Sequence, residues 1–288
     1  MRKIALLPEG TVSHEAVLKL FGESVEFKHY KQIADVFMAV ATGVVDYSAI
    51  PVENTIEGTV SLHMDWLVHE VDVPIQVEWV YPSIQNLIGS ELEFMRDGQL
   101  DFSQITRVFS HPVALAQCQQ FIRTYLPHAE LESVGSTAEA IQKVVNHSDQ
   151  GWAAIGTELG AARYGLDILR AEVTDHNHNF TRFILIGNEP CSLHKPQTAL
   201  KTSMIVTLPS DFPGALHQVL SAFAWRQLNL ARIESRPTKK MLGSYYFYLD
   251  VLEPMDSILL QSAIEEIRAL GFQVRILGSY PSYSFGEI

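Results

Sequence analysis

The sequence predicts an α/β chain in two parts, a large N-terminal domain and a smaller C-terminal module. In the first part, short apolar runs alternate with helical patterns, which is typical of a domain that alternates strands and helices. Residues 188–201, "NEPCSLHKPQTALK", contain prolines and no hydrophobic period, and therefore indicate a linker. The residues that follow have the order βαββαβ, which is that of a ferredoxin-like module. We place the domain at residues 1–190, the linker at 191–200 and the module at 201–280.

The elements of the large domain follow from its apolar runs and from the spacing of its apolar residues. Short runs rich in β-branched and aromatic residues predict strands, and apolar residues at helical spacing predict helices. The predicted strands are Lys3–Leu7, Tyr47–Val52, Val73–Tyr81, Thr106–Phe109, Trp152–Ile155 and Phe183–Gly187. The predicted helices are Val12–Phe21, Ile33–Thr42, Thr59–Val68, Pro112–Tyr125, Thr137–Asn146 and Glu158–Arg163.

The C-terminal module has clearer signals than the domain before it. The first of its helices carries one apolar face at helical spacing, to which Leu216, Val219 and Phe223 contribute. The predicted strands cover residues 202–208, 229–237, 244–252 and 272–280, and the predicted helices cover residues 213–228 and 256–271.

The charge of the chain limits its possible partners. The 288 residues carry a formal net charge of −12, which argues against nucleic acid and anionic membranes as partners. A site for an anionic substrate must therefore be locally positive. Helix N-termini, together with a few Arg or Lys side chains, can provide that field.

Several features indicate a cytoplasmic protein. The two cysteines, Cys118 and Cys191, are far apart in the sequence and have no metal-like spacing, which is typical of a reduced compartment. The start "MRKIALLPEG" has too short an apolar run for a secretory signal. The longest apolar stretch, residues 36–45, is far shorter than a membrane span.

Motifs for metal, nucleotide or serine-hydrolase chemistry have little support. His176 and His178 form an HxH pair, but no third ligand has a helpful spacing, so we predict no metal site. The sequence has no GxGxxG, Walker or GxSxG pattern. Cys118 lies within the helical run "ALAQCQQF" and is better explained as a small core residue than as a nucleophile.

Several strand-to-helix junctions of the large domain carry Ser, Thr or Asn. "STAE" (Ser136–Glu139) has the spacing of a capping box, and "NTIE" (Asn54–Glu57) resembles one with Asn as the cap. A single junction of this kind is most simply a helix cap. In open α/β sheets, however, strand ends and helix N-termini line the ligand crevice, and their free N–H groups suit carboxylates. The set of junctions therefore predicts a site for a small anionic ligand.

One further junction places Thr181 beside Arg182, where the polar run "DHNHN" meets the apolar run "FILIG". Taken alone, "TRF" is most simply a polar loop that leads into a buried strand, with the arginine solvated or in a salt bridge. Its context makes it more specific, because it is the last of four motifs that resemble, in order, those of the prephenate dehydratase family. These motifs are "VDYSAIPVENTIEGTV" (Val45–Val60), "SHPVALAQC" (Ser110–Cys118), "STAEA" (Ser136–Ala140) and "NFTRF" (Asn179–Phe183).

Two motifs of the C-terminal module are similar to the paired motifs of the family's ACT domain, which binds phenylalanine. They are "GALH" (Gly214–His217) and "ESRP" (Glu234–Pro237). The chain departs from the family at its first motif, which is usually near "GPxGTFS". Here it is "LPEGTVS", with Leu7 and Val12 in place of Gly and Phe, so the local contacts near Thr11 differ from those of the usual motif.

The resemblance implies a fold, an activity and an assembly. The fold is a catalytic domain of two α/β subdomains about a cleft, like the periplasmic binding proteins, followed by the ACT domain. The activity is the loss of CO2 and water from prephenate to give phenylpyruvate, which needs no cofactor because aromatisation drives it. The chain resembles the monofunctional bacterial type, feedback-inhibited by phenylalanine and assembled as a homodimer or homotetramer. Arogenate as substrate, or a non-catalytic amino-acid-sensing binding protein, are the alternatives.

The resemblance also implies roles for individual residues. Thr181 donates a hydrogen bond to the departing hydroxyl, and Arg182 holds either its own loop or the pyruvyl carboxylate. Glu53 and Glu57 act indirectly, because a carboxylate cannot bind a dianion. The substrate-orienting residues are Asn54, Ser110, Gln117, Ser136 and Thr137, although Gln117 lies far enough into its helix to face solvent. The expected phenylalanine-binding residues are Gly214, Ala215, Leu216, His217, Glu234, Ser235, Arg236 and Pro237.

Overall fold

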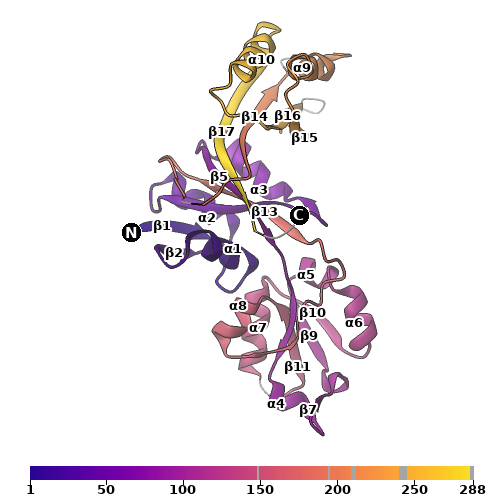
Figure 1. Cartoon of the computed structure of the whole chain (residues 1–288). Coiled ribbons are helices and arrows are strands. Elements are labelled where there is room, and N and C mark those ends of the chain that lie inside the picture. The colour runs from indigo at the N-terminus through magenta and orange to yellow at the C-terminus, as the bar shows by residue number, and fades with distance from the viewer. Residues whose placement is uncertain (148, 194, 209–211, 240–244, 286–288) are drawn as a thin grey trace. The chain divides into compact units, whose positions relative to one another are not determined.

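The computed structural model describes the chain except for residues 148, 194, 209–211, 240–244 and 286–288 (Figure 1). The described chain forms two compact units. The first comprises Met1–Val71 and Tyr81–Phe183, and the second comprises Asp72–Val80 and Ile184–Glu287.

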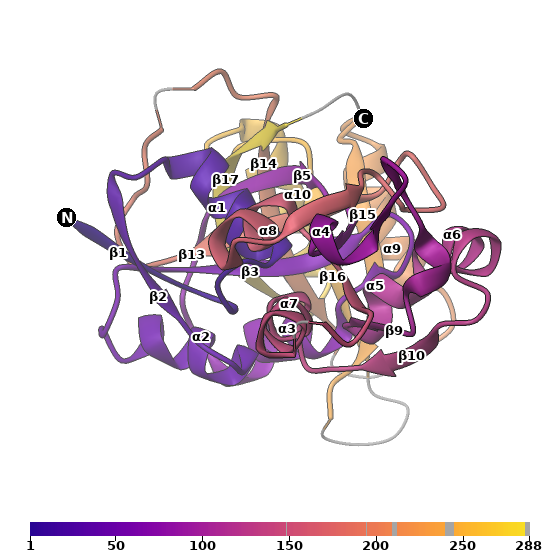
Figure 2. The ribbon, with the colours of Figure 1, turned by 90° about the horizontal axis from the view of Figure 1, so that it is seen from below.

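The first lobe of the first unit is built on three parallel strands in the order β2, β1, β3. Ile4 of the central strand is in register with Phe27 on one side and Tyr47 on the other. Helices cover opposite sides of these strands (Figure 2), so the central strand is buried on both faces. The elements are β1 (Arg2–Leu6), α1 (Val12–Phe21), β2 (Val25–His29), α2 (Ile33–Ala41) and β3 (Tyr47–Asn54).

The segment after β3 differs from the predicted helix over residues 59–68. A short strand, β4 (Gly58–Thr59), first pairs with the end of β3. The helix α3 then begins at Ser61, ends at Asp65 and continues as one π-helical turn, η1 (Trp66–Glu70). The polar residues before Ser61 therefore belong to a turn and a strand.

The second lobe of the first unit contains a five-stranded sheet in the order β10, β9, β11, β6, β12. The first three strands are parallel, and the last two are antiparallel to their neighbours. Successive residues face two different cores, since Val108 packs with one group of helices and Phe109 with the other. The strands are β6 (Asn86–Gly89), β9 (Arg107–Ser110), β10 (Glu130–Ser133), β11 (Trp152–Gly156) and β12 (Asp167–Arg170).

Helices lie on both sides of this sheet (Figure 1). The helix predicted over residues 112–125 is divided in two, because the backbone leaves the helical conformation at Cys118. The helices are α5 (Pro112–Ala116) and α6 (Gln119–Tyr125) on one side and α7 (Thr137–Asn146) and α8 (Glu158–Tyr164) on the other. Small elements complete the lobe, namely α4 (Glu91–Phe94), β7 (Met95–Arg96), β8 (Gln99–Leu100) and η2 (Phe102–Gln104).

The second unit contains the predicted βαββαβ module. Its strands are antiparallel in the order β15, β16, β14, β17, and apolar residues of both helices pack on the strands, with Met204 opposite Leu249 in the core. The elements are β14 (Ala199–Thr207), α9 (Ala215–Ala224), β15 (Leu230–Pro237), β16 (Tyr245–Val251), α10 (Ile258–Ala269) and β17 (Gln273–Ser284). The predicted fold class, a mixed α/β chain that ends in a ferredoxin-like module, is confirmed.

The last strand is longer than predicted and gives the second unit an additional strand pair. Ser282–Ser284 of β17 pair in parallel with Glu78–Val80 of β5 (Ile75–Pro82). The remaining strand, β13 (Phe180–Ile186), begins in the first unit and ends in the second. Within the described residues, no helix is both long and apolar enough to span a membrane.

Candidate active site

A group of hydrogen-bonded polar side chains surrounds Thr181, the second residue of β13. Thr181 is half-buried. Its Oγ1 lies 3.1 Å from the Nδ2 of Asn54 and 2.6 Å from the Oγ of Ser83. We call Asn54, Ser83, Gln117, Asn179 and Thr181 the Thr181 cluster.

Asn54 has a fixed amide orientation. Its Oδ1 accepts hydrogen bonds from the backbone N–H groups of Ile56 (2.9 Å) and Glu57 (3.1 Å). Its Nδ2 therefore points toward β13, where it also donates to Asn179 Oδ1 (2.8 Å) and to a main-chain carbonyl. Asn54 caps a turn, which corrects the prediction that it stands at a helix N-terminus. In an Asx turn and in a helix cap alike, the Asn side chain accepts from N–H groups two or three residues later, so the sequence could not distinguish the two.

Asn179 joins the segments that meet at Thr181. Its Oδ1 accepts from Asn54, and its Nδ2 donates to the main-chain oxygen of Ser83 (3.0 Å) and to Gln117 Oε1 (2.9 Å). Every hydrogen-bonding group of its side chain is thus used inside the protein. Asn179 belongs to the "NFTRF" motif, but its linking role could not be inferred from sequence, since its partners are far away along the chain.

Gln117 faces the cluster. It follows α5 directly, is only 5% exposed, and uses its Oε1 to accept from Asn179. Its Nε2 group has no acceptor among the described residues, so this N–H donor can serve a ligand. The alternative that Gln117 faces solvent is therefore wrong.

Ser110 and Arg182 are committed to structural contacts. Ser110 has no exposed surface, and its hydroxyl donates to the carbonyl of Ile155 at 2.7 Å, which ties β9 to β11. Arg182 is 9% exposed, and its Nη1 lies 3.2 Å from Glu53 Oε2. The substrate-orienting role expected for Ser110 stays a prediction, and its hydroxyl is engaged with the Ile155 carbonyl. Of the two roles left open for Arg182, its ion pair with Glu53 favours holding the protein segment over binding the pyruvyl carboxylate.

The predicted capping box at the start of α7 is present. Ser136 Oγ accepts from Glu139 N (3.1 Å), and Glu139 Oε2 accepts from Gly135 N (3.0 Å). Thr137, the first helical residue, is nearly buried. Ser136 and Thr137 make no hydrogen bond to the Thr181 cluster in the described part of the chain.

The first turn of α7 instead lies beside the loop between β1 and α1. Gly10 of that loop has a φ of 76°, and a Cβ on it would stand 3.7 Å from the Cβ of Ala138 and 3.2 Å from the Cα of Gly160. The Gly10 carbonyl accepts a 2.9 Å hydrogen bond from Thr157, the N-cap of α8. The N-termini of α1, α7 and α8 therefore come together at Gly10. The first-turn N–H groups of α8 are already used, since Leu159 N–H donates to Glu15 Oε1 (2.9 Å) and Gly160 N–H donates to Thr157 Oγ1 (3.0 Å).

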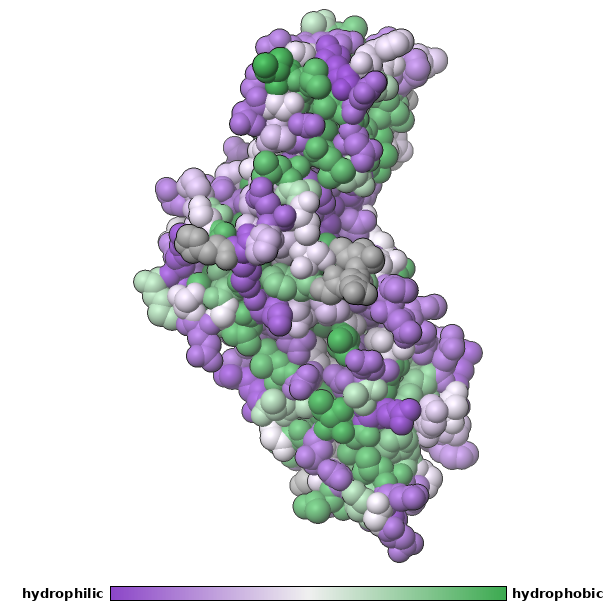
Figure 3. Space-filling view, viewed as in Figure 1, coloured by the Kyte–Doolittle hydropathy of each residue, from purple (hydrophilic) through white to green (hydrophobic). Residues whose placement is uncertain are grey.

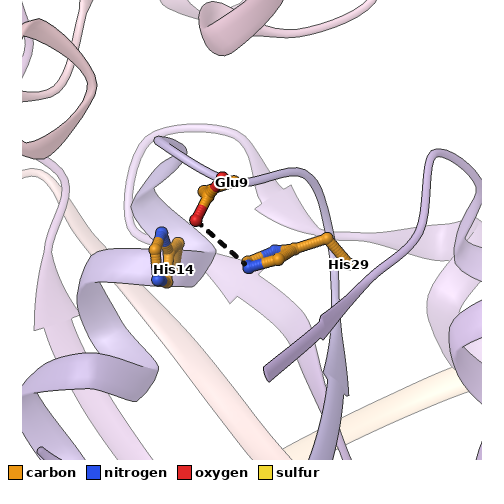
Figure 4. Close-up of side chains that lie close together, drawn as sticks. All are labelled: Glu9, His14 and His29. Atoms are coloured by element: carbon orange, nitrogen blue, oxygen red, sulfur yellow. Dashed lines mark ion pairs between the residues drawn. The ribbon is translucent and has the colours of Figure 1, made fainter. Parts of the chain in front are cut away.

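A compact group of side chains braces the same loop (Figure 4). Glu9, His14 and His29 offer ligand atoms within 4.8 Å of one another, a donor set that suits a transition metal. However, Arg163 already pairs with Glu9 Oε1 at 2.5 Å, and the Gly10 N–H donates to His14 Nδ1 at 3.2 Å. These contacts account for the cluster as a hydrogen-bonded brace. His176 and His178, the pair considered from sequence, are exposed.

His14 is held in its neutral form. Burial, reinforced by the neighbouring His29, lowers the pKa of His14 to about 4. The hydrogen bond from Gly10 requires Nδ1 to be an acceptor, so the ring proton lies on Nε2. His29 is oriented by its Nδ1, which lies 3.0 Å from the carbonyl of Leu7.

Comparison with known proteins assigns the chain to a family. The model of the prephenate dehydratase family matches residues 4–191, more than half of the sequence. The chain belongs to the prephenate dehydratase family. The ACT-domain model matches residues 202–272, so the ferredoxin-like module is an ACT domain.

Individual relatives support the family assignment. Prephenate dehydratase of Bacillus subtilis is 37% identical over 281 residues, which cover 96% of this chain and 97% of that protein. The crystal structure of prephenate dehydratase from Arthrobacter aurescens in complex with L-Phe has a TM-score of 0.83 and 31% identity, with coverage of 96% and 89% of the two chains. A structure described as a novel type of quorum-quenching acylase, GqqA, has a TM-score of 0.82 and 26% identity, and covers 98% of both chains.

The first ACT motif lies where α9 begins. Gly214 is the N-cap, with a φ of 90°, and Ala215 is the first helical residue, so the helix starts later than the predicted Pro213. Ala215 is buried, Leu216 is half-buried and His217 is exposed. The first turn of α9 is therefore open to solvent on the His217 side.

The second ACT motif lies on β15. Glu234 accepts from Arg232 (2.5 Å) and Arg236 (2.9 Å), and these three side chains lie on the less exposed face of the strand. Ser235 and Pro237 lie on its exposed face. Glu234 and Arg236 thus bind each other, whereas Ser235 and Pro237 are accessible.

Proposed function

We propose that this protein is a prephenate dehydratase in which the Thr181 hydroxyl acts on the departing hydroxyl group of the substrate. The observation that carries this proposal is the pair of contacts to Thr181 Oγ1, from Asn54 Nδ2 and Ser83 Oγ. They hold a neutral donor at the start of a buried strand. The remaining Nε2 donor of Gln117 is suited to one of the substrate's carboxylates.

The chemistry requires few groups. The bond between the ring and its carboxylate breaks and releases CO2, and the electron pair shifts through the ring and expels the hydroxyl group at the opposite position. That hydroxyl leaves as water after it takes one proton, and the ring becomes aromatic. Threonine is a weak acid, so Thr181 contributes a positioned hydrogen bond, and such general-acid effects accelerate reactions by roughly 10²–10⁴-fold.

The neutral character of the Thr181 cluster suits this reaction. A cation on the carboxylate that becomes CO2 would stabilise the charged ground state and oppose its loss. The one guanidinium of the motif, on Arg182, is paired with Glu53 and is nearly buried. Amide and hydroxyl donors can orient the substrate without this penalty. We propose no cofactor, because aromatisation drives the reaction.

Acyl transfer is a second function, raised by the likeness to a quorum-quenching acylase. A hydroxyl nucleophile for acyl transfer needs a neighbouring general base. Among the residues that the structure describes, neither Ser83 nor Thr181 hydrogen-bonds a histidine or a carboxylate. The contacts of the two hydroxyls therefore favour the dehydratase.

We further propose that L-phenylalanine binds the ACT module and inhibits the enzyme. The first-turn N–H groups of α9 can receive the amino acid's carboxylate, and Gly214 leaves the backbone open to it. Inhibition requires that phenylalanine prefer one state of the protein, with a coupling of about 1–3 kcal/mol. The prephenate dehydratase of Arthrobacter aurescens was solved in complex with L-Phe, which supports phenylalanine as the ligand to test.

We propose that the chain assembles as a homodimer or homotetramer through the ACT module, and that it works in the cytoplasm. Large apolar side chains are exposed on this module, among them Ile233 (46%), Trp225 (81%) and Ile258 (78%). Figure 3 shows hydrophobic side chains over α10 on the face in view. Exposed apolar side chains can form interaction surfaces where they lie together. Light scattering of the purified protein measures the assembly directly.

The proposed activity is tested by parallel assays of the purified protein, with EDTA present throughout. Prephenate and arogenate are supplied separately, and CO2 and the aromatic product are both measured. We expect one CO2 and one phenylpyruvate for each prephenate consumed, and slower turnover of arogenate. Faster release of phenylalanine from arogenate would make the protein an arogenate dehydratase. Absence of turnover with both substrates would leave a binding protein.

A further inference from the structure

Ser83 lies next to Thr181, although it belongs to none of the family motifs in the sequence. It follows β5, on the short connection to β6, and is 4% exposed. Among the residues that the structure describes, its hydroxyl makes one hydrogen bond, to Thr181 Oγ1 at 2.6 Å. The two residues are 98 positions apart in the chain, so only the tertiary structure brings them together.

The connection holds Ser83 rigidly against β13. Its backbone N–H donates to the Asn179 carbonyl at 2.7 Å, and its carbonyl accepts from Asn179 Nδ2 at 3.0 Å. Asn179 stands two residues before Thr181. Both main-chain polar groups of Ser83 are therefore bonded to Asn179, and this fixes the position of the Ser83 hydroxyl relative to Thr181.

The direction of the Ser83–Thr181 hydrogen bond follows from counting donors and acceptors. A hydroxyl group has one proton and two acceptor positions. If Thr181 donated to Ser83, the buried Ser83 proton would have no acceptor among the described residues, and such buried, unsatisfied donors are rare. Ser83 therefore donates to Thr181.

This direction determines where the proton of Thr181 can go. Thr181 Oγ1 accepts from Ser83 and from Asn54 Nδ2, whose two protons serve three acceptors, so that one proton is shared. Both acceptor positions of Thr181 Oγ1 are then engaged. Its own proton then points away from both partners, on a side chain that is half-buried. A donor that is itself an acceptor of two hydrogen bonds is also more strongly polarised.

We infer that Ser83 is a positioning residue for the reaction, which donates to Thr181 and thereby directs the Thr181 proton to the substrate hydroxyl. This inference rests on the proposed dehydratase function. A residue that only supports the fold would affect kcat whether or not the Thr181 hydroxyl is present. Ser83, as a positioning residue, affects kcat only through that hydroxyl.

The test is a set of variants assayed on prephenate. Ser83→Ala removes the donor, and we expect kcat to fall by roughly tenfold or more with KM changed less than about twofold. Ser83→Thr keeps the hydroxyl and should recover much of the loss. In a Thr181→Ala background, Ser83→Ala should cause little further loss, because the group through which it acts is gone.

The control is Ser24→Ala, which removes an exposed hydroxyl that donates to the Phe21 carbonyl. It should leave kcat unchanged. Ser83→Cys, with a side chain of similar size and a weak donor, replaces Ser83→Ala if that variant does not fold, and should show the same loss of kcat.

Two results would overturn the inference, namely a kcat of Ser83→Ala within twofold of wild type, or an equal loss from Ser83→Ala with and without the Thr181 hydroxyl. Failure of the proposed function gives a different result. In that case the wild-type protein does not turn over prephenate, or Thr181→Ala alone leaves its rate unchanged.

Discussion

At the level of single residues, the Thr181 cluster fixes the orientation of each amide it contains. Two backbone N–H groups hold Asn54 Oδ1, and Asn179 uses both ends of its side chain inside the protein. No rotation of either amide keeps all of these hydrogen bonds. The donors that remain for a ligand, the Thr181 hydroxyl and Gln117 Nε2, are therefore held in place before the substrate arrives, which is where catalytic advantage comes from.

His14 leads to a prediction about pH. Its pKa in the folded protein is about 4, below its ordinary value near 6.5, so between these pH values the unfolded chain binds the extra proton. Stability contributed by neutral His14 is thus present above pH 6.5 and is lost as the pH falls to about 4. Compared with His14→Gln, which can still accept from Gly10, the wild type should lose roughly 2–3 kcal/mol more of its unfolding free energy between pH 7 and 4.

Chemical denaturation at several pH values measures this difference. The matched control is His128→Gln, which replaces an exposed histidine and should follow the wild type. Parallel stability curves for wild type and His14→Gln would show that His14 does not titrate in this range.

Only part of the candidate site could be predicted from the sequence. Thr181, Asn54 and Gln117 lie in motifs that resemble the family's, and the structure brings all three together. Ser83 could not be found in this way, because a lone serine after a strand has no local signal. The family resemblance gives Ser110 a substrate-orienting role, which stays a prediction, and the sequence could not reveal that its hydroxyl donates to the Ile155 carbonyl.

At the level of elements, the close meeting of α1, α7 and α8 at Gly10 leads to a second prediction. Gly10→Ala adds a Cβ at a positive φ and 3.2 Å from Gly160 Cα. We expect a loss of roughly 2–4 kcal/mol in unfolding free energy, from strain and crowding together. Gly165→Ala is the matched control, because Gly165 also has a positive φ but has nothing within 4 Å of the added Cβ.

The control should lose about 1 kcal/mol, the cost of a left-handed backbone alone. Denaturant unfolding of both variants gives the comparison. Equal losses would mean that the contact between the β1–α1 loop and α8 yields easily and does not hold the two elements together.

The start of α9 leads to a third prediction, on phenylalanine. Gly214→Ala introduces strain at a φ of 90° without a clash, because nothing lies within 4 Å of the new Cβ. If the first turn of α9 binds the effector, phenylalanine affinity should fall by about tenfold or more, which corresponds to about 1.4 kcal/mol. Gly271→Ala is the control, with a φ of 91° and equally open surroundings at the end of α10.

Calorimetric titration of both variants with L-phenylalanine decides the matter. An unchanged affinity of Gly214→Ala, or an equal loss in Gly271→Ala, would place the effector site elsewhere.

Elements with a strong apolar period were predicted best. The helices at Val12–Phe21 and Thr137–Asn146 have the predicted bounds, and all six elements of the ACT module are present. The strands β2, β6, β10 and β12 were missed, because they are short or carry polar residues on an exposed face, as "ELES" of β10 does. Tertiary pairing, and not local propensity, makes them strands.

At the level of the whole molecule, strand β5, which precedes the predicted linker in the sequence, depends on residues that follow the linker. Glu78 of β5 has no exposed surface, and its Oε1 takes hydrogen bonds from Lys201 (2.5 Å) and Ser282 (2.8 Å). The sequence indicated an independent catalytic segment, because residues 191–200 have the composition of a linker. The pairing of β5 with the end of β17 could not be foreseen, since it joins residues far apart in the chain.

This dependence leads to a fourth prediction, that the fragment 1–200 is unstable. Removing residues 201–288 leaves β5 without β17 and leaves the buried Glu78 carboxylate without Lys201. The fragment therefore loses the β5–β17 strand pair and the hydrogen bonds from Lys201 and Ser282 to Glu78 Oε1. Thermal unfolding followed by circular dichroism should show a lower and broader transition than in the full chain.

A fragment that melts at the temperature of the full chain would show that the two parts fold independently. The domain boundaries at residues 190 and 201 would then be the working limits of the catalytic domain, as the composition of the linker suggested.

The kcat of Thr181→Ala on prephenate tests the account most directly. The account predicts a fall of at least about 10²-fold with an unchanged fold, because the hydroxyl that aids departure of the substrate's hydroxyl group is lost. Thr181→Ser, which keeps the hydroxyl, should retain activity within about tenfold of wild type. A purified, folded Thr181→Ala protein with more than half of the wild-type kcat would contradict the account.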